Sequence, residues 1–367
     1  MPSAIVTGAT GILGREIVKE LCSRPEEWNT IYAMSRSKKE DFGPRVKHVH
    51  LDLTAVAETM SDDLKDVEAD YVFFAAYLQQ DSEEESDMLN AFCKALEITG
   101  RASSIKRFVL VTGAKNYGVH LGRVKLPMQE TDPWYRILHE FCEKHSIEWN
   151  VTYSNEVFGF AKGNFMNFAS AIAIYAAVSK ELGDELVFPG SEEFYTNLTV
   201  FTDATLHAQF SRWAVLEPRA ANEAFNVVNG DVESWMNLWP RVAKYFGLTV
   251  PADQFLRDAP LASERPLAPE PPASVLAKEM GLQDRVPQSY IRQRIDLKKM
   301  VDREGLDLSA LNKASWAFAG FAWGRNYNVV LNMTKSRKLG WTGYLDSWEN
   351  LESIFETLQK EKVIPKM

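Results

Sequence analysis

The sequence lacks a long apolar run, because no stretch approaches the about 18 consecutive apolar residues of a membrane-spanning helix. It also lacks a basic N-terminal region followed by an apolar segment, so we expect no secretory signal peptide. Basic residues are not in excess: the formal net charge is −9, which argues against nucleic acid and anionic membranes as partners. A small molecule is therefore the expected partner.

Cysteine is scarce, and its spacing excludes two kinds of site. Cys22, Cys93 and Cys142 lie far apart, with neither a C-x-x-C pair nor the Cys/His spacing of a metal site. We therefore expect reduced thiols in a cytoplasmic protein, with no disulfide framework and no bound metal. Five prolines fall between residues 259 and 272, which predicts an extended surface connection there.

The first 160 residues alternate strand-like and helix-like segments. This alternation predicts a parallel sheet covered by helices on both faces, which is an α/β fold with a doubly wound, Rossmann-type sheet. The expected strands are 3–7, 30–34, 47–51, 70–75, 107–112 and 149–153, and the expected helices are 12–22, 55–60, 86–97 and 135–145.

A glycine-rich segment, Thr7–Gly14, reads T-G-A-T-G-I-L-G and follows the apolar residues Ala4–Val6. A strand, a glycine-rich turn and a helix in this order form the context of a dinucleotide-binding site. Gly8 permits the tight turn, Gly11 lets a pyrophosphate approach the backbone, and Gly14 lets the helix pack closely on the strand. The phosphates would then bind free N–H groups at the helix N-terminus.

The residues after the second expected strand indicate which dinucleotide binds. Ser35–Lys39 reads S-R-S-K-K and lacks the Asp or Glu that usually accepts a hydrogen bond from the 2′-hydroxyl of NAD. The Arg36 guanidinium can instead make charge-assisted, bidentate contacts with a 2′-phosphate. We therefore predict that NADP(H) binds. The alternative is that these charged residues are only a solvent-exposed surface segment. Asp52 is placed for the adenine amino group, and Ala75 and Ala76 for the adenosine ribose and pyrophosphate.

After the fifth expected strand, Thr112–Tyr117 reads T-G-A-K-N-Y. Four further segments match one known family in order: 149–151, 157–160, 222–231 and 333–340. With the G-x-x-G-x-x-G spacing, nearly the whole chain resembles the progesterone 5β-reductase/iridoid synthase-like (PRISE) family of extended or atypical short-chain dehydrogenases/reductases, and its fungal members most. The resemblance implies NADPH-dependent reduction of the C=C bond of a conjugated enone or enal. It also implies that Lys115 hydrogen-bonds the nicotinamide ribose and lowers the pKa of a neighbouring phenol.

The chain departs from the family at its catalytic tyrosine. Family members carry this tyrosine in an Asn-Phe-Tyr-Tyr segment followed by Glu-Asp, and its hydroxyl stabilises the enolate oxygen that forms as hydride arrives. That segment is missing here, because residues 127–133 pass at once to Trp134 and Tyr135. We take Tyr135 and Tyr117, beside Lys115, as the candidate catalytic residues. A surface or packing role is the alternative for Tyr135.

A second departure lies on the nicotinamide side. Residues 152–154 read Thr-Tyr-Ser where the family usually has His-Arg-Pro. Ser154 removes the proline that would rigidify this turn, and Tyr153 replaces a cation with a phenol. The nearly uncharged stretch 158–177 predicts a buried helix and is compatible with the wall of a substrate pocket. The predicted pocket residues are Tyr117, Tyr153, Phe165, Met166 and Asn167.

The expected division places an NADP-binding Rossmann domain at 1–160. A mostly helical substrate-binding portion follows at 161–367 and packs on the C-terminal edge of the sheet. The predicted cofactor contacts are Gly8, Thr10, Gly11, Ile12, Leu13, Ser35, Arg36, Ser37, Asp52, Leu53, Ala75, Ala76, Thr112, Lys115, Ser154 and Val157.

Two classes of function fit these observations. The first is an NADPH-dependent reductase of an activated alkene, or of a carbonyl, in a hydrophobic small molecule of secondary metabolism. The second is a non-redox cyclase, isomerase or pericyclase on the same scaffold, which the missing tyrosine segment motivates. A dinucleotide sensor is a third interpretation, although the aromatic C-terminal half fits a substrate cavity better. A homodimer is a further expectation.

Overall fold

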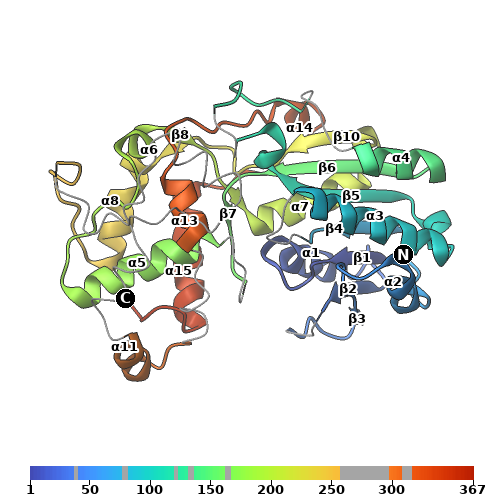
Figure 1. Ribbon diagram of the computed structural model, residues 1–367, viewed down its shortest axis with the longest axis horizontal. Coiled ribbons are helices and arrows are strands. Elements are labelled where there is room, and N and C mark those ends of the chain that lie inside the picture. Colours follow the sequence, from blue (N-terminus) through green and yellow to red (C-terminus); the bar gives the residue numbers. More distant parts are fainter. Residues whose placement is uncertain are drawn as a thin grey trace.

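Seven strands form the central sheet of the protein, whose computed structural model describes residues 1–36, 40–76, 82–119, 123–130, 136–161, 167–256, 297–307 and 316–367. The strands are β1 (Ala4–Thr7), β2 (Ile31–Ser35), β3 (Val46–His50), β4 (Tyr71–Phe74), β5 (Arg107–Gly113), β6 (Glu148–Ser154) and β10 (Glu223–Asn226). Their order is β10-β6-β5-β4-β1-β2-β3, and every neighbouring pair is parallel (Figure 1). The predicted Rossmann-type α/β fold is therefore confirmed.

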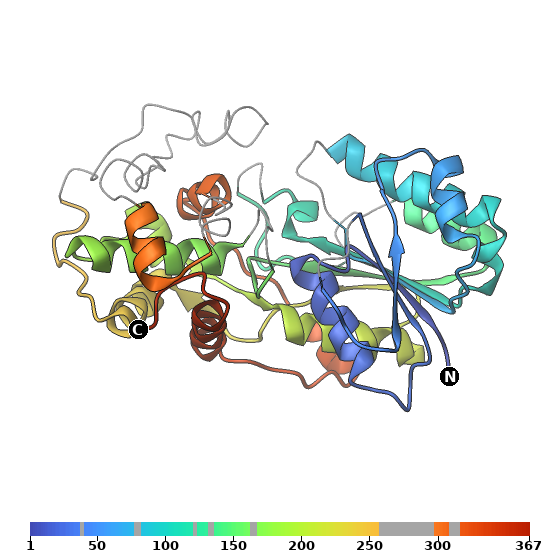
Figure 2. The same cartoon turned by 90° about the horizontal axis from the view of Figure 1, so that it is seen from below.

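Helices cover both faces of this sheet (Figure 2). One face carries α1 (Ile12–Cys22) and α7 (Ala204–Leu216), and the other carries α2 (Ala57–Leu64), α3 (Ser82–Ile98) and α4 (Arg136–His145). Because successive strand residues point to opposite faces, Val6 packs in the core under α1 whereas Ile5 packs in the opposite core. Strands buried on both faces explain why the sequence shows short continuous apolar runs here.

The C-terminal portion is mainly helical and has its own core (Figure 1). Helix α5 (Phe168–Leu182) is buried along most of its length, so the apolar stretch at 158–177 does contain a buried helix, although that helix begins at Phe168. The other helices are α6 (Glu192–Thr196), α8 (Trp235–Phe246), α11 (Leu297–Glu304), α13 (Trp316–Trp323), α14 (Thr334–Lys338) and α15 (Ser347–Lys360). The short elements are β7 (Val157–Phe158), β8 (Leu198–Thr199), β9 (Thr202–Asp203), β11 (Glu233–Ser234), η1 (Arg101–Ser104), η2 (Ala114–Tyr117) and η3 (Pro218–Ala220).

The sheet extends beyond the first 160 residues of the chain. Strand β10 pairs with β6 in parallel, with Ala224 opposite Val151, and α7 packs against α1. The division at residue 160 therefore stays a prediction, while the sheet itself draws on residues from both sides of it. The proline-rich stretch 259–272 lies outside the described residues. Among those described, no helix combines the length and the apolarity needed to cross a membrane.

Candidate functional site

The glycine-rich segment forms a tight loop between β1 and α1. Gly8 has a φ of +62°, and its carbonyl accepts a hydrogen bond from the Gly11 N–H at 2.8 Å. Gly11 is the N-cap of α1 and offers no side chain to cap the helix. The first N–H groups of a helix have no partner within it, so this N-terminus has the character of an anion site. Gly8, Thr10, Gly11, Ile12 and Leu13 lie in this loop and at the start of α1, and their contact with a pyrophosphate stays a prediction.

At two of the three glycine positions, close backbone contacts leave no space for a side chain. A Cβ on Gly8 would lie 2.7 Å from the Ala75 carbonyl oxygen and 2.8 Å from the Ala76 Cα. The segment after β4 therefore lies directly against the glycine loop, while contact of Ala75 and Ala76 with a cofactor stays a prediction. A Cβ on Gly14 would lie 2.3 Å from the Gly8 carbonyl oxygen. The expected reason for Gly14 was thus incomplete, because the close contact is with the loop rather than with the strand.

The end of β2 carries the residues predicted to select the cofactor. Ser35 is half-buried, and its Oγ lies 3.0 Å from Nε2 of His48, while Arg36 is exposed. Hydrogen bonds from the Thr54 hydroxyl and backbone N–H hold the pKa of Asp52 below its ordinary value, and the charge of Arg36 adds to this effect. Leu53 is half-buried beside Asp52, and Ser37 lies outside the described residues.

Lys115 and Tyr117 lie in η2, directly after β5. Lys115 is exposed, whereas Tyr117 is partly buried and its ring centre lies 4.9 Å from that of Tyr153. The Tyr117 hydroxyl donates to Oδ1 of Asn226 at 2.7 Å. Nδ2 of Asn226 donates to the carbonyls of Met128 and Asn332, and this fixes which atom of the amide faces Tyr117. In this geometry the phenolic proton is therefore committed to Asn226.

The end of β6 lies beside the end of β5. The Ser154 hydroxyl donates to the Thr112 carbonyl at 3.0 Å, and the Thr112 hydroxyl donates to the Thr152 carbonyl at 2.9 Å. Tyr153 is fully buried. The glycine loop, Ser35, Lys115 and Ser154 all follow or end parallel strands, so they lie at one edge of the sheet. This edge is the candidate site.

The remaining predicted residues divide into two groups. Val157 begins β7 and is half-buried, and Asn167 is the N-cap of α5, where its side chain accepts a hydrogen bond from the Ser170 N–H at 3.1 Å. Asn167 is thus buried and caps α5, and its place in a substrate pocket stays a prediction. Like Ser37, the predicted residues Tyr135, Phe165 and Met166 lie outside the described part of the chain.

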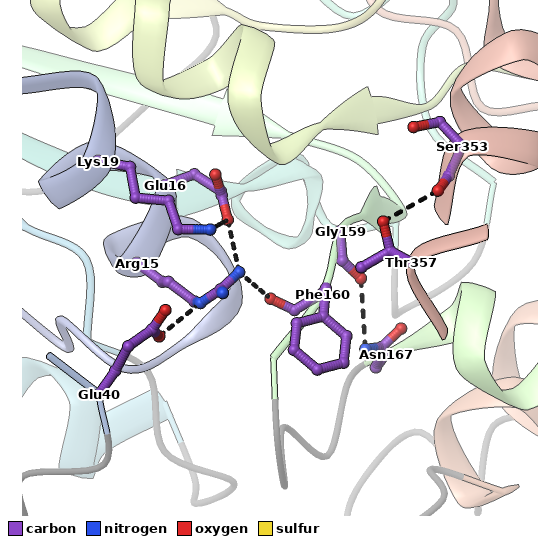
Figure 3. A network of polar contacts seen from close by, with 9 residues as sticks. All are labelled: Arg15, Glu16, Lys19, Glu40, Gly159, Phe160, Asn167, Ser353 and Thr357. Atoms are coloured by element: carbon purple, nitrogen blue, oxygen red, sulfur yellow. Dashed lines mark hydrogen bonds and ion pairs between the residues drawn. The ribbon is translucent and has the colours of Figure 1, made fainter. Parts of the chain in front are cut away.

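Arg15 joins the glycine loop to two other segments (Figure 3). Its Nε lies 2.6 Å from Glu40 of the segment after β2, and its Nη1 lies 2.8 Å from Glu16. Nη1 also donates to the Phe160 carbonyl at 3.4 Å, and the guanidinium lies 5.2 Å from the centre of the Phe160 ring. The start of α1 is thereby tied both to the segment after β2 and to the chain that follows β7.

A buried ion pair lies beside the turn that follows β6 and was not predicted. Glu156 has a φ of +39° and pairs with Arg325, and their side chains are 4% and 3% exposed. The guanidinium also lies 4.7 Å from the centre of the Phe194 ring, and burial lowers the pKa of Arg325 to about 10. A positive φ on a residue other than glycine is costly and is found preferentially at functional sites.

A cavity of about 680 Å³ lies away from this edge, between α6, α8 and residues 248–255. None of the predicted site residues lines it. A smaller cavity of about 20 Å³ lies beside Thr10 and Ser35, at the end of β2. The small cavity therefore belongs to the candidate site, and the large one does not.

The comparisons with known proteins agree with this geometry. The PRISE-like Rossmann-fold domain model matches residues 48–262, and an NAD-binding model described as male sterility protein matches residues 6–71. An uncharacterised protein of Schizosaccharomyces pombe is 36% identical, covering 99% of this chain and 98% of its own. A 3-oxo-Δ4,5-steroid 5β-reductase of Arabidopsis thaliana is 24% identical, covering 99% and 93%.

Among solved structures, the Bordetella bronchiseptica enzyme WbmG in complex with NAD and UDP has a TM-score of 0.60 at 15% identity, covering 99% of this chain and 95% of that one. Likeness at this identity shows the fold alone. The NAD-binding model supports a nicotinamide cofactor at the glycine loop. With more than half of its length matched by the PRISE-like model, the chain belongs to the PRISE-like family of short-chain dehydrogenases/reductases.

Proposed function

We propose that this protein is an NADPH-dependent reductase of an activated alkene, a conjugated enone or enal, or of a carbonyl, in a hydrophobic small molecule. The observation that carries the proposal is the shared sheet edge, which brings the glycine loop, Arg36 and Lys115 to one side of the sheet. The relative named as a steroid 5β-reductase supports reduction of a 3-oxo-Δ4,5 system, which is a conjugated enone.

The residues present fit NADP(H). Gly8 and Gly14 allow close backbone contacts that a Cβ would block, α1 has no side-chain cap, and β2 ends in Ser35 and is followed by Arg36 rather than by a carboxylate. The loop and the helix N-terminus would hold the pyrophosphate, and Arg36 would hold the 2′-phosphate. When bound, NADPH supplies the hydride. Lys115 would orient the nicotinamide ribose and add positive potential where an enolate oxygen develops.

Lys115→Ala is expected to lower turnover by on the order of 10²-fold, because the ribose loses an orienting hydrogen bond and small misplacements at the reacting atoms are costly. Turnover is measured as NADPH oxidation with progesterone, 2-cyclohexen-1-one and citral as probe substrates. Lys106→Ala is the matched control, since Lys106 precedes the opposite end of β5 and pairs with Asp70 at 2.8 Å. Wild-type turnover in Lys115→Ala would show that Lys115 takes no part in the reaction.

Tyr117→Phe is expected to lower turnover by less than about tenfold and the free energy of unfolding by about 1–3 kcal/mol, because the buried Oδ1 of Asn226 loses its donor. The turnover loss is small because the Tyr117 hydroxyl donates to Asn226. An oxyanion donor would instead contribute about 10²–10³ in turnover. Turnover and urea unfolding are compared with those of Tyr344→Phe, an exposed tyrosine. A loss above about 10²-fold would show that the phenol leaves Asn226 and acts on the substrate.

A non-redox cyclase, isomerase or pericyclase is the second candidate. Two observations favour it: the family's tyrosine segment is missing, and the Tyr117 proton is committed to Asn226. Such an enzyme would fold its substrate by shape and polarise a carbonyl without transferring hydride. Conversion of a probe substrate with no consumption of NADPH would favour this candidate over the reductase.

A further inference from the structure

The turn after β6 begins at the candidate site and consists of two residues, Asn155 and Glu156, between the end of β6 and the start of β7. Ser154, which ends β6, lies opposite Gly113 in the pairing of β5 with β6. Gly113 precedes Lys115 by two positions, so the turn begins beside the segment that carries Lys115. A change in the path of this turn would therefore alter the sheet edge at which the cofactor is proposed to bind.

Hydrogen bonds tie the first residue of the turn to the sheet. The Asn155 N–H donates to the Thr202 hydroxyl at 3.0 Å, and Nδ2 of Asn155 donates to the Val200 carbonyl at 2.6 Å. The Thr202 hydroxyl in turn donates at 2.7 Å to the carbonyl of Val227, the residue that follows β10. Asn155 is thus fixed to segments that adjoin the central sheet.

The second residue of the turn, Glu156, is tied to the helical portion of the chain. Its carboxylate pairs with the guanidinium of Arg325, which follows α13, and both side chains are buried. Nε of Arg325 donates to the Ala322 carbonyl at 3.1 Å, and the Arg325 carbonyl accepts a hydrogen bond from the Ser191 hydroxyl at 3.0 Å. The guanidinium also packs on the Phe194 ring of α6. The ion pair therefore fixes Glu156 relative to α6 and α13.

Two features of Glu156 give no account in terms of stability. Its φ of +39° is unfavourable for a residue with a side chain, and such backbone strain persists only where the surrounding structure imposes it. Burying a carboxylate and a guanidinium costs a desolvation free energy that their attraction often does no more than offset, so an apolar pair of similar volume is often as stable. What the ion pair does provide is a fixed path for the chain between Ser154 and Val157.

We infer that Glu156 and Arg325 are positioning residues for the proposed reaction: their ion pair holds the turn after β6 so that the nicotinamide end of the cofactor lies correctly against the substrate. The inference rests on the proposed function, because it concerns the cofactor and the reaction assigned there. Both residues act through the backbone, since the predicted cofactor contacts Ser154 and Val157 flank the turn.

The double variant Glu156→Leu/Arg325→Met removes both charges and keeps similar side-chain volumes. Its midpoint of urea unfolding is expected to stay near that of the wild type, because no buried charge is left unpaired. Its kcat for NADPH oxidation with 2-cyclohexen-1-one should fall by on the order of 10²-fold, because the turn relaxes and the reacting atoms are misplaced. The calorimetric Kd of NADPH should change little, since the glycine loop proposed to hold the pyrophosphate is untouched.

Glu156→Gln should show the opposite pattern. Glutamine keeps the shape of the side chain and an oxygen that accepts a hydrogen bond from the Arg325 guanidinium, so the turn keeps its path and kcat stays close to that of the wild type. The urea midpoint should fall, because Arg325 is left as a buried charge without a counter-charge. A role in stability alone cannot produce both results, since a stable variant would then keep its turnover.

Glu181→Leu/Arg303→Met is the matched control, because it makes the same replacements at an exposed ion pair, 2.6 Å long, that joins α5 and α11. It should keep the wild-type kcat. A wild-type kcat in Glu156→Leu/Arg325→Met overturns the inference alone, and so does a folded Glu156→Gln whose kcat falls as far as that of the double variant. A wild type that oxidises no NADPH with any probe substrate contradicts the proposed function, and the inference fails with it.

Discussion

Gly14→Ala is expected to abolish tight dinucleotide binding and to lower the free energy of unfolding by about 1–3 kcal/mol. The added Cβ would lie 2.3 Å from the Gly8 carbonyl oxygen, 2.8 Å from the Gly8 carbonyl carbon and 3.2 Å from the Ala9 nitrogen. All three are backbone atoms, so no side-chain rotation relieves the contact. The loop must move away from α1, and losing two charge-assisted bonds to phosphate would weaken NADPH by about 10²-fold or more.

Calorimetric binding of NADPH and thermal unfolding together test this expectation. Gly11→Ala is an informative comparison, because its Cβ meets the Gly8 carbonyl oxygen at the less severe distance of 3.2 Å. We expect it to cost less stability than Gly14→Ala. Cys22→Ala, in the last turn of the same helix, controls for substitution in α1. Wild-type affinity in Gly14→Ala would contradict the position of the phosphate site.

Arg325→Met is expected to lower the free energy of unfolding by about 3–5 kcal/mol, because Glu156 would be left as an unpaired buried charge. The pH dependence of this stability loss follows from the direction in which the pKa of the Glu156 carboxyl shifts. In the variant, the lone carboxyl has a raised pKa in the folded state, so its protonated form suits the fold better. The stability loss is therefore small below the unfolded carboxyl pKa of about 4.3 and grows as the pH rises above it.

The double variant Glu156→Leu/Arg325→Met separates the cost of an unpaired buried charge from the cost of lost packing. A buried ion pair replaced as a whole by apolar side chains is often neutral or stabilising. We therefore expect the double variant to recover most of the stability that Arg325→Met loses, as measured by urea unfolding at neutral pH. If the double variant were as unstable as Arg325→Met, the loss would come from packing around Phe194 rather than from the unpaired carboxylate.

The local parts of the fold were predictable, because their signals are local. Helix α1 spans the predicted residues 12–22, and six of the seven strands lie within a residue or so of the predicted ranges. Strand β10 was missed, because its four residues give no clear apolar run and its place in the sheet depends on pairing with β6. The arrangement of the helical portion likewise depends on contacts between distant segments.

In the site, too, residues in local motifs were predictable, whereas residues brought together by contacts between distant segments were not. The glycine loop, Ser35, Arg36 and Lys115 were recognisable, since each belongs to a short motif next to a strand. Asn226 was not, because its bond to Tyr117 joins residues 109 positions apart. Glu156 and Arg325 stand in no recognisable pattern, and only folding brings them together.

The central claim is hydride transfer to an activated alkene, and one measurement tests it most directly. The purified protein is incubated with NADPH carrying deuterium at both C4 positions of the nicotinamide and with progesterone, 2-cyclohexen-1-one or citral, and the product is analysed by NMR. We predict that one equivalent of cofactor is oxidised per product and that deuterium appears at the carbon β to the carbonyl. A converted substrate without deuterium, formed with no NADPH oxidised, would contradict the reductase and leave the non-redox enzyme in its place.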